Sequence, residues 1–447
     1  MFYVMVAVFV LGYVMIALEH PLRVNKSASA LLLGVIMWTL FALCNPLALP
    51  EYSPAQTYLE ANAGSSFIEW VTHVALVHHL GEIAEILFFL LGAMTIVELV
   101  DCHGGFSIIT DRIKATRKVS LLWVISIITF FMSAVLDNLT TAIVMVALLR
   151  KLIGDRKDRW IFGGMIIIAA NAGGAWSPIG DVTTIMLWIG GKISAVSIMQ
   201  AVFLPSLASL IVPLGILSFT VKGEAARPEK NDEHRRVELK AWERNLVFFM
   251  GIGLLLFVPV FKTITHLPPY LGVLGGLSLL WIATEVMNIR RPESDAGRLS
   301  VAAMLHRIDV PSILFFLGIL VAVAAMQTCG QLMALSMGLD TIPLQEPGKY
   351  YLITVIMGML SSVIDNVPLV AGAMGMYSFP IDHYFWEFTA YAAGVGGSIL
   401  IIGSAAGVAV MGMEKIDFIW YLKRISLLAL AGYLAGCGVF MLEQMLR

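Results

Sequence analysis

The sequence has 447 residues, of which 59% are hydrophobic and 13% are charged, and its mean hydropathy is +0.85. This composition predicts a polytopic membrane protein. The formal net charge is −2 and the basic residues are spread over many short loops, so no nucleic-acid surface is expected. The four cysteines are scattered along apolar stretches, which indicates neither a disulfide framework nor a metal site.

Ten apolar windows are long enough to cross about 30 Å of hydrocarbon. They lie near 1–19, 28–47, 82–101, 160–190, 195–220, 245–262, 269–289, 310–336, 385–412 and 425–445. The first window lacks a basic flank and a small-residue cleavage site, so it is interpreted as a spanning helix. Residues 64–80 have apolar side chains at helical spacing and are expected to form an interfacial helix before the crossing at 82.

Two further apolar segments, 119–149 and 350–377, each contain an Asp-Asn pair. The first carries SAVLDN at 133–138, and the second carries SSVIDN at 361–366. Cytoplasmic loops are rich in Lys and Arg, and basic residues flank both ends of the first segment, which predicts a re-entrant hairpin from the cytoplasmic side. These residues are Arg112, Lys114, Arg117 and Lys118 before it, and Arg150, Lys151, Arg156, Lys157 and Arg159 after it.

The flanks of the second segment, 337–349 and 378–384, contain one basic residue, Lys349. This segment is therefore expected to enter and leave from the outside. Other motifs recur in the same order: ILFFL at 86–90 and 313–317, AANAGG at 169–174 with AAGVGG at 392–397, and Gly-Asp at 180–181 with Gly-Ser at 403–404. Inverted repeats that each contain a hairpin and a broken helix are typical of secondary transporters.

The pattern predicts an all-α polytopic membrane protein of four parts. These are N-terminal transmembrane helices with the interfacial helix at 1–81, a first inverted repeat at 82–222, a charged cytoplasmic linker with scaffold helices at 223–309, and a second inverted repeat at 310–447. Each repeat has a re-entrant helical hairpin and a broken transmembrane helix.

Carboxylates at the two hairpin tips are the main candidates for ion handling. A buried carboxylate in a membrane segment usually faces a cavity and binds ions or protons. Sodium is expected at Asp137, Asn138, Asp365 and Asn366, with the hydroxyls of Thr140 and Thr141 as further oxygen ligands. Alternatively, each Asp-Asn pair caps the second half of its hairpin through backbone amides, and the two roles are compatible.

Glycine-rich breaks in the helices form the second candidate element, because exposed backbone at membrane depth lines a cavity or is buried in protein. The polar candidates at these breaks are Asn171, Ser177, Asp181, Thr183, Thr184, Ser398 and Ser404. Asp181 aligns with Ser404, so this carboxylate occurs in one repeat only, which favours a proton-specific role. Capping of a half-helix that begins at Val182 is the alternative.

Further titratable residues lie in and before the crossing at 82–101. Glu85 and Glu98 are its deeper charges, and they either bind protons or lie at helix ends. His73, His78 and His79 titrate near neutrality. These histidines either sense pH or occupy the interface.

Four motifs closely resemble those of NhaD-type sodium/proton antiporters, which belong to an ion-transporter superfamily with arsenite and dicarboxylate carriers. They are VLDNLTTAIVM, NAGGAWSPIGDVTT, SSVIDNVPLVAGAMGMY and GSAAGVAVMGMEKIDF. The resemblance implies exchange of Na⁺ and Li⁺ for H⁺ in a bacterial inner membrane, in alkaline or saline conditions. It also implies a homodimer, no enzymatic activity and no cofactor beyond the transported ions.

The hairpin tips differ from those of the dicarboxylate carriers, which read Ser-Asn-Thr. Here they read Asp-Asn-Leu-Thr and Asp-Asn-Val-Pro, so the second tip lacks the threonine. Carboxylates repel a dianion, and a cation fits better as the substrate. Two alternatives stay open: a sodium-coupled carrier of a small anion on the same fold, and a membrane aspartyl protease, whose Gly-x-Gly-Asp signature is absent.

Overall fold

The computed structural model describes residues 2–17, 19, 23–44, 54–62, 64–110, 113, 115–225, 239–289 and 291–446, in which every regular element is a helix. Eight helical runs in these ranges are long and apolar enough to cross a membrane, which confirms the predicted all-α polytopic class. They are α3 (Lys26–Cys44), α5–α6 (Phe67–Cys102), α8 (Lys118–Leu136), α12 (Ala195–Thr220), α13 (Ala241–Thr265), α14 (Pro269–Asn288), α17 (Val310–Thr328) and α24 (Ser426–Leu446).

The other helices do not combine this length with this apolar character. They are α1 (Phe2–Ala17), α4 (Pro54–Ala61), α7 (Ser107–Thr110), α9 (Asn138–Leu152), α10 (Arg156–Ala175), α11 (Val182–Ile189), α15 (Glu293–Arg298), α16 (Val301–Leu305), α18 (Gln331–Asp340), α19 (Gly348–Leu360), α20 (Asn366–Met376), α21 (Tyr384–Gly396), α22 (Ala405–Glu414) and α23 (Phe418–Arg424). The chain forms two compact units. Unit 1 is Met1–Phe88, Asp309–Ile353 and Val367–Pro380; unit 2 is Phe89–Ile308, Thr354–Asn366 and Ile381–Arg447.

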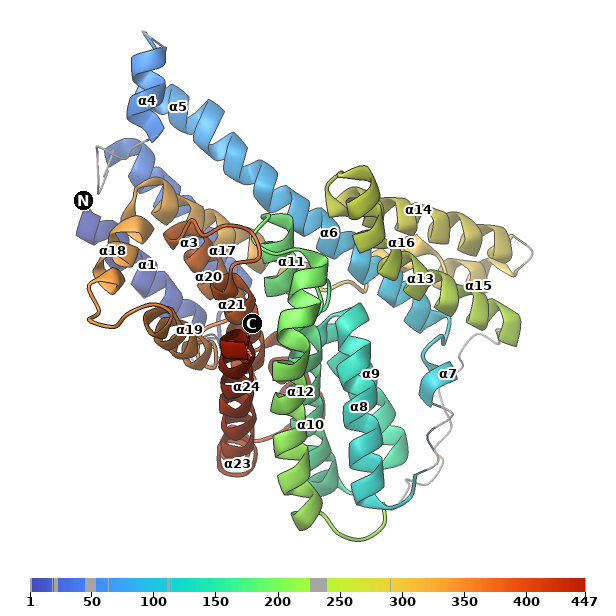
Figure 1. Cartoon of the computed structure of the whole chain (residues 1–447). Coiled ribbons are helices and arrows are strands. Elements are labelled where there is room, and N and C mark those ends of the chain that lie inside the picture. The colour runs from blue at the N-terminus through green and yellow to red at the C-terminus, as the bar shows by residue number, and fades with distance from the viewer. Residues whose placement is uncertain are drawn as a thin grey trace. The chain divides into compact units, whose positions relative to one another are not determined.

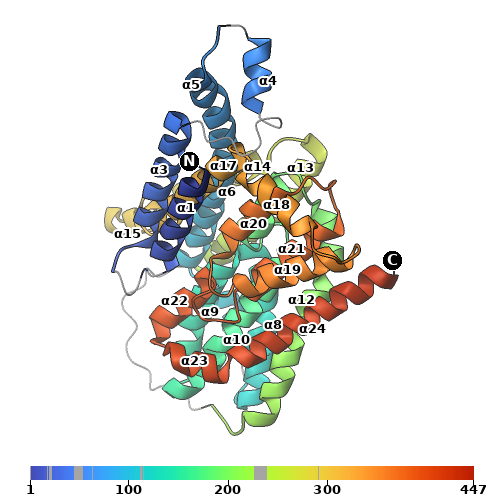
Figure 2. The same cartoon turned by 90° about the vertical axis from the view of Figure 1, so that its left-hand side faces the viewer.

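In unit 1, α3 packs along α17 and beside α1 (Figure 2). The indole Nε1 of Trp38 on α3 donates to the Val321 carbonyl oxygen at 2.8 Å. Residues 67–102 form one continuous helical run through α5, a π-helical turn at Val71–Ala75 and α6, so the expected interfacial helix joins the crossing without a break. Its position at the membrane interface stays a prediction. Apolar side chains at helical spacing on both sides of residue 80 explain this continuity.

The first special segment forms a helical hairpin in unit 2. Its arms are α8 and α9, and they pack against α10, with α12 beside α10 (Figure 1). Lys118 Nζ, at the start of α8, lies 2.7 Å from Asp158 Oδ2, which follows the end of α9. The two ends of the segment therefore meet, as the basic flanks predict for a segment that turns back.

The second special segment contains α19 and α20. The ring of Tyr350 near its start lies 5.7 Å from that of Tyr377 just after its end, both in unit 1. The two turns differ in length, because Asp137 alone separates α8 from α9, whereas residues 361–365 separate α19 from α20.

Two helices are interrupted at the glycine-rich sequences. One break separates α10 from α11, and the other separates α21 from α22. Backbone approach is very close at both, because a Cβ on Gly173 would lie 2.1 Å from the Phe130 oxygen and one on Gly396 would lie 2.0 Å from the Gly358 oxygen. Only glycine allows this approach.

A second pair of contacts repeats between the same elements. Ser133 Oγ donates to the Ala170 oxygen at 2.5 Å, and Ser361 Oγ donates to the Ala393 oxygen at 2.7 Å. A hairpin arm thus contacts a broken helix in the same way in both halves, which supports an internal repeat. The opposite orientation of the halves in the membrane stays a prediction.

The linker expected at 223–244 lies partly outside the described residues, which omit 226–238. Two of the basic residues that flank the first special segment, Arg112 and Lys114, also lie outside them. The scaffold helices that follow it, α13 and α14, pack against each other (Figure 1).

A labelling experiment tests the direction of the first hairpin. We expect Ala115→Cys and Arg156→Cys, each in a cysteine-free background, to resist an impermeant thiol reagent added outside intact cells, because basic flanks stay in the cytoplasm. Ser378→Cys, at an exposed position between α20 and α21, is the control and should react. Labelling of only one of the first two positions would exclude the predicted topology.

Candidate ion-binding site

The Asp181 carboxylate contacts residues from several elements of unit 2. It is 1% exposed and forms the N-cap of α11, where its Oδ1 accepts hydrogen bonds from the Thr183 backbone N–H at 2.9 Å and hydroxyl at 2.7 Å. The capping role expected for Asp181 is therefore present. Its Oδ2 stays available to groups from other helices.

Amides from both hairpin tips donate to this carboxylate. Asn138 Nδ2, in the first turn of α9, lies 2.6 Å from Asp181 Oδ2. Asn366 Nδ2, in the first turn of α20, lies 3.2 and 3.4 Å from the two Asp181 oxygens. Residues 228 positions apart in sequence thus contact the same carboxylate.

Asn171 on α10 extends the network to the second broken helix. Its Oδ1 accepts from Asn138 Nδ2 at 3.0 Å. Its own Nδ2 donates to the hydroxyl oxygens of Ser398 and Ser404, each at 2.9 Å. Ser404 also caps α22, where it accepts from the Gly407 N–H, so Ser404 and Asp181 occupy equivalent caps.

Asp137 makes different contacts. Both of its carboxylate oxygens are held by Thr140, one through the backbone N–H and one through the hydroxyl, each at 2.8 Å. The backbone of Asp137 has φ 82° and ψ 158°, a region that only glycine adopts without strain and that costs roughly 1–3 kcal/mol. The single-residue turn between two helices forces this conformation. Asp365 is not among the residues with positive φ.

Each hairpin tip places a further carboxylate next to this network. Asp137 directly precedes Asn138, and Asp365 directly precedes Asn366, and these two asparagines contact the Asp181 carboxylate. Among the described residues, no Lys or Arg forms an ion pair with Asp137 or Asp181. Buried carboxylates without basic partners favour the binding of a cation or a proton.

Two more predicted residues adjoin the network. The Thr141 hydroxyl on α9 is fully buried and has no hydrogen-bond partner in the described part of the chain. Buried hydroxyls are nearly always paired, so this oxygen is free to bind an ion or a water. Ser177 instead donates to the Ala134 oxygen at 2.5 Å and fixes the break against α8.

The remaining candidates lie outside this network. Glu98 faces Arg307 at 3.4 Å, and Glu85 is half-buried on α6. His73 is exposed, and His78 pairs with Glu82 at 3.4 Å. His79 Nε2 lies 2.9 Å from the Thr328 hydroxyl on α17. These three histidines belong to unit 1, whereas the carboxylate network belongs to unit 2.

Sequence reasoning missed two supports of the site. The Tyr421 hydroxyl donates to the Ser398 carbonyl oxygen at 2.8 Å and holds the second break in place. Glu414, at the end of α22, lies 2.6 Å from Arg150 Nε and 2.8 Å from Arg159 Nε. In the sequence, Glu414 stands out as a glutamate at the end of an apolar segment. Arg150 and Arg159 indicated only the topology of the first hairpin.

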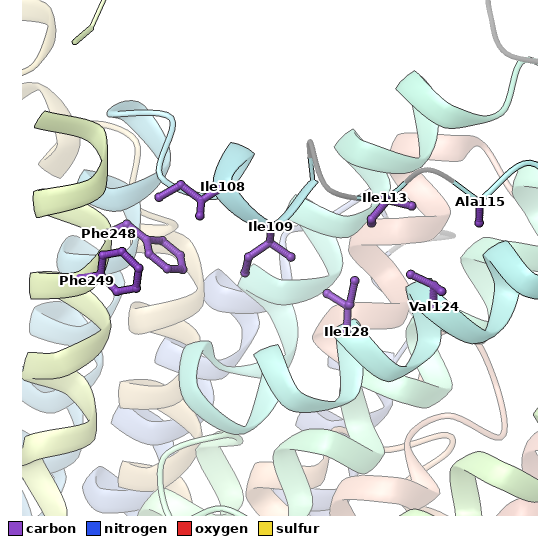
Figure 3. A pocket seen from close by; sticks show the side chains of 8 residues that line it. All are labelled: Ile108, Ile109, Ile113, Ala115, Val124, Ile128, Phe248 and Phe249. Carbon is purple, nitrogen blue, oxygen red and sulfur yellow. The ribbon is translucent and has the colours of Figure 1, made fainter. Parts of the chain in front are cut away.

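Neither the carboxylates nor the amides line the apolar groove of unit 2 (Figure 3). This groove has a volume of about 560 Å³ and carries only hydrocarbon side chains, contributed by α7, the stretch that follows it, α8 and α13. It has no ligand for an ion. Across the described ranges, no group of three or more His, Cys, Asp and Glu side chains is arranged to hold a metal.

Comparison with known proteins gives a consistent result. A family model described as a citrate transporter matches residues 13–396. Sodium/proton antiporter 1 of Arabidopsis thaliana is 46% identical over 441 residues, which cover 98% of this chain and 72% of that protein. Sodium/proton antiporter 2 of the same plant is 43% identical over 98% of both chains. The Na⁺/H⁺ antiporter NhaD of Vibrio cholerae is 32% identical over 98% of this chain and 91% of that protein.

The chain belongs to the NhaD-type sodium/proton antiporter family. The predicted family is confirmed, and so is the prediction of a transporter and not an enzyme. In this NhaD-type chain, hydrogen bonds join one carboxylate, the amides of Asn138, Asn171 and Asn366, and the hydroxyls of Thr183, Ser398 and Ser404 into one network. Oxygens of these kinds are the ligands that hard cations prefer. The same carboxylate can instead hold a proton.

Proposed function

We propose that this chain exchanges Na⁺, and also Li⁺, for H⁺, and that both ions compete for the network centred on Asp181. The observation that carries the proposal is a buried carboxylate that has no basic partner in the described chain and that accepts amide hydrogens from both hairpin tips. Relatives named sodium/proton antiporters, at up to 46% identity, support the same exchange.

Rotation of two amides gives the exchange a simple mechanism. An Asn side chain offers either N–H donors or a carbonyl acceptor, depending on its rotation. In the structure, Asn138 and Asn366 donate to Asp181, which stabilises the carboxylate without an ion. When Na⁺ binds, the two amides rotate and present their oxygens beside the carboxylate. When a proton binds, Asp181 becomes a donor and the cation is released.

Asp137 and Asp365 complete the charge balance in this proposal. Each lies next to an asparagine that contacts Asp181, so the site holds three carboxylates whose mutual repulsion a bound cation would relieve. The unpaired Thr141 hydroxyl supplies one more oxygen near the first tip. Because the second tip has Val-Pro where the first has Leu-Thr, we assign more of the ion ligands to the first.

The apparent Na⁺ affinity is expected to improve as pH rises. Protons and Na⁺ compete for one site, so on the acid side of the titration the affinity should change about tenfold per pH unit. Proton-gradient decay measured in vesicles at several Na⁺ concentrations and pH values gives this slope. A flat affinity between about pH 6.5 and 9.5, the range that brackets raised carboxylate titrations, would contradict shared sites.

The substrate is tested in everted vesicles that have an acid interior. Na⁺ or Li⁺ should collapse the proton gradient, whereas citrate, succinate and arsenite should not. The anions are included because the matching family model is described as a citrate transporter. Three carboxylates around one site repel a dianion. Uptake of labelled citrate at rates comparable to Na⁺ exchange would contradict the assignment as an antiporter and would favour a sodium-coupled anion carrier.

We place the protein in the inner membrane of a bacterium as a homodimer. Relatives from Vibrio cholerae and Alkalimonas amylolytica named NhaD support a bacterial membrane, and the superfamily resemblance supports the dimer. The mass of the detergent-solubilised protein by light scattering, corrected for detergent, tests the dimer. A monomeric mass would contradict the proposed homodimer and would leave the proposed ion site unaffected.

A further inference from the structure

A second pocket in unit 2 combines basic and apolar walls. Its volume is about 600 Å³, and it lies among the ends of α8, α10, α12, α23 and α24. The charged side chains that line it are Lys118, Asp158, Lys222, Lys423 and Arg424. They come from four loops that the positive-inside pattern assigns to the same, cytoplasmic side.

Local structure brings the basic residues together. The backbone N–H of Lys118 donates to the Gly223 oxygen at 3.0 Å, and that of Ala225 donates to the Thr116 oxygen at 2.8 Å. This short pairing holds Lys118 beside Lys222. The last turn of α23 supplies Lys423 and Arg424 from another part of the chain.

The positive charges of this pocket exceed its negative charge. Asp158 neutralises only Lys118, with which it forms an ion pair at 2.7 Å. In the described chain, Lys222, Lys423 and Arg424 form no ion pair. Three cations without a carboxylate partner in the described chain favour an anionic ligand that binds several of them.

The apolar wall decides which anion fits. Ile216 on α12 and Leu427 on α24 line the pocket and are 43% and 71% exposed, although both belong to helices that are apolar enough to span a membrane. A soluble phosphate would contact only the charged rim. A phospholipid would contact the rim with its headgroup and the apolar wall with an acyl chain.

We propose that this pocket binds an anionic phospholipid, with its phosphate at Lys222, Lys423 and Arg424 and an acyl chain against Ile216 and Leu427. Basic pockets between transmembrane helices on the cytoplasmic side hold anionic headgroups. The lipid would join α12 to the α23–α24 corner. This site is separate in its residues from the carboxylate network.

Native mass spectrometry of the detergent-purified full chain tests the proposal. The probes are dioleoyl phosphatidylglycerol and dioleoyl phosphatidylcholine, which have the same chains and differ in headgroup charge, and inorganic phosphate as a competitor. Phosphatidylglycerol should bind more tightly than phosphatidylcholine and resist phosphate. Each basic residue near an anionic headgroup contributes about a fivefold factor, so Lys222→Gln with Lys423→Gln and Arg424→Gln should weaken binding about 100-fold.

A matched variant carries the same charge change outside the pocket. Lys157, Arg298 and Lys415 are exposed in unit 2 and do not line the pocket, so their replacement by Gln should leave binding unchanged. Leu427→Ser should weaken phosphatidylglycerol binding while the basic residues stay in place. If the triple variant does not fold, the single variants provide the test, each with about a fivefold loss.

Three results would overturn the lipid site. Equal binding of phosphatidylcholine would show that the pocket is an unspecific apolar surface. Displacement of the lipid by phosphate would show that it is a site for soluble anions. Undiminished lipid binding by the pocket variants would show that the lipid binds elsewhere. Antiport activity is not the readout, so a failure here leaves the proposed exchange untouched.

Discussion

Replacing Asp181 with Asn is expected to abolish Na⁺-driven proton exchange. The variant keeps the size of the side chain and the acceptor for the Thr183 N–H, so α11 stays capped. It removes the charge on which the amides of Asn138 and Asn366 converge. A contact with an ionised partner is worth roughly 1.5–3 kcal/mol, so the apparent Na⁺ affinity should fall about 10- to 150-fold. Proton coupling should be lost completely.

The control for this variant is Asp155→Asn. Asp155 also caps a helix, α10, and accepts from the Asp158 N–H at 2.8 Å. That backbone hydrogen bond holds the pKa of Asp155 below its ordinary value, so it stays ionised in the working range and contributes no titration there. Asp155→Asn should retain wild-type exchange. Proton-gradient decay in everted vesicles, normalised to the amount of protein in the membrane, compares the two.

Asp181→Ser separates capping from charge. Serine stands at the equivalent cap of the second broken helix, Ser404, so this variant gives the first half the chemistry of the second. We expect normal amounts of protein and no exchange. Retained exchange in both Asp181 variants would move the ion site to Asp137 and Asp365, the tips that the sequence favours.

The hairpins and helix breaks were predictable because their signals are local. Basic residues on both flanks of 119–149 indicate a segment that turns back, and glycines at 173–174 and 396–397 mark interruptions. The continuous helical run at 67–102 was not predictable, because an interfacial and a spanning helix share the same apolar spacing. The π-helical turn at Val71–Ala75 lies between them without any sequence break.

Most residues of the hydrogen-bond network were predictable, but not its centre. Repeat comparison identified Asp137, Asp365 and the asymmetric Asp181 as candidates, and sequence reasoning favoured the first two because they recur. The structure instead joins Asn138 and Asn366 to Asp181. Contacts between segments about 40 and 185 residues apart depend on how the breaks pack, which no local pattern encodes. The single-residue turn at Asp137 also makes the two tips unequal in a way that their similar sequences hide.

Glu414→Ala is expected to destabilise the protein strongly. Glu414 is 2% exposed in its side chain and binds Arg150 and Arg159, and the Trp160 indole donates to its backbone oxygen at 3.0 Å. Removing one partner of a buried ion pair costs about 3–5 kcal/mol because the other charge is left uncompensated. Since the Arg150 side chain is 47% exposed, water compensates part of this cost, and we expect a loss of roughly 2–4 kcal/mol in the free energy of unfolding.

Glu285→Ala is the matched control for Glu414→Ala. Glu285 accepts from the Trp281 indole at 2.7 Å on an exposed face of α14, and such surface changes alter stability by about 0.5 kcal/mol or less. Denaturant unfolding of both purified variants, followed by tryptophan fluorescence, compares them with the unsubstituted protein. Because Glu414 ends α22 and Arg150 lies in the last turn of α9, the loss of Glu414 frees the second broken helix from the first hairpin. Equal stability of the two variants would show that this ion cluster adds nothing to the packing of the two halves.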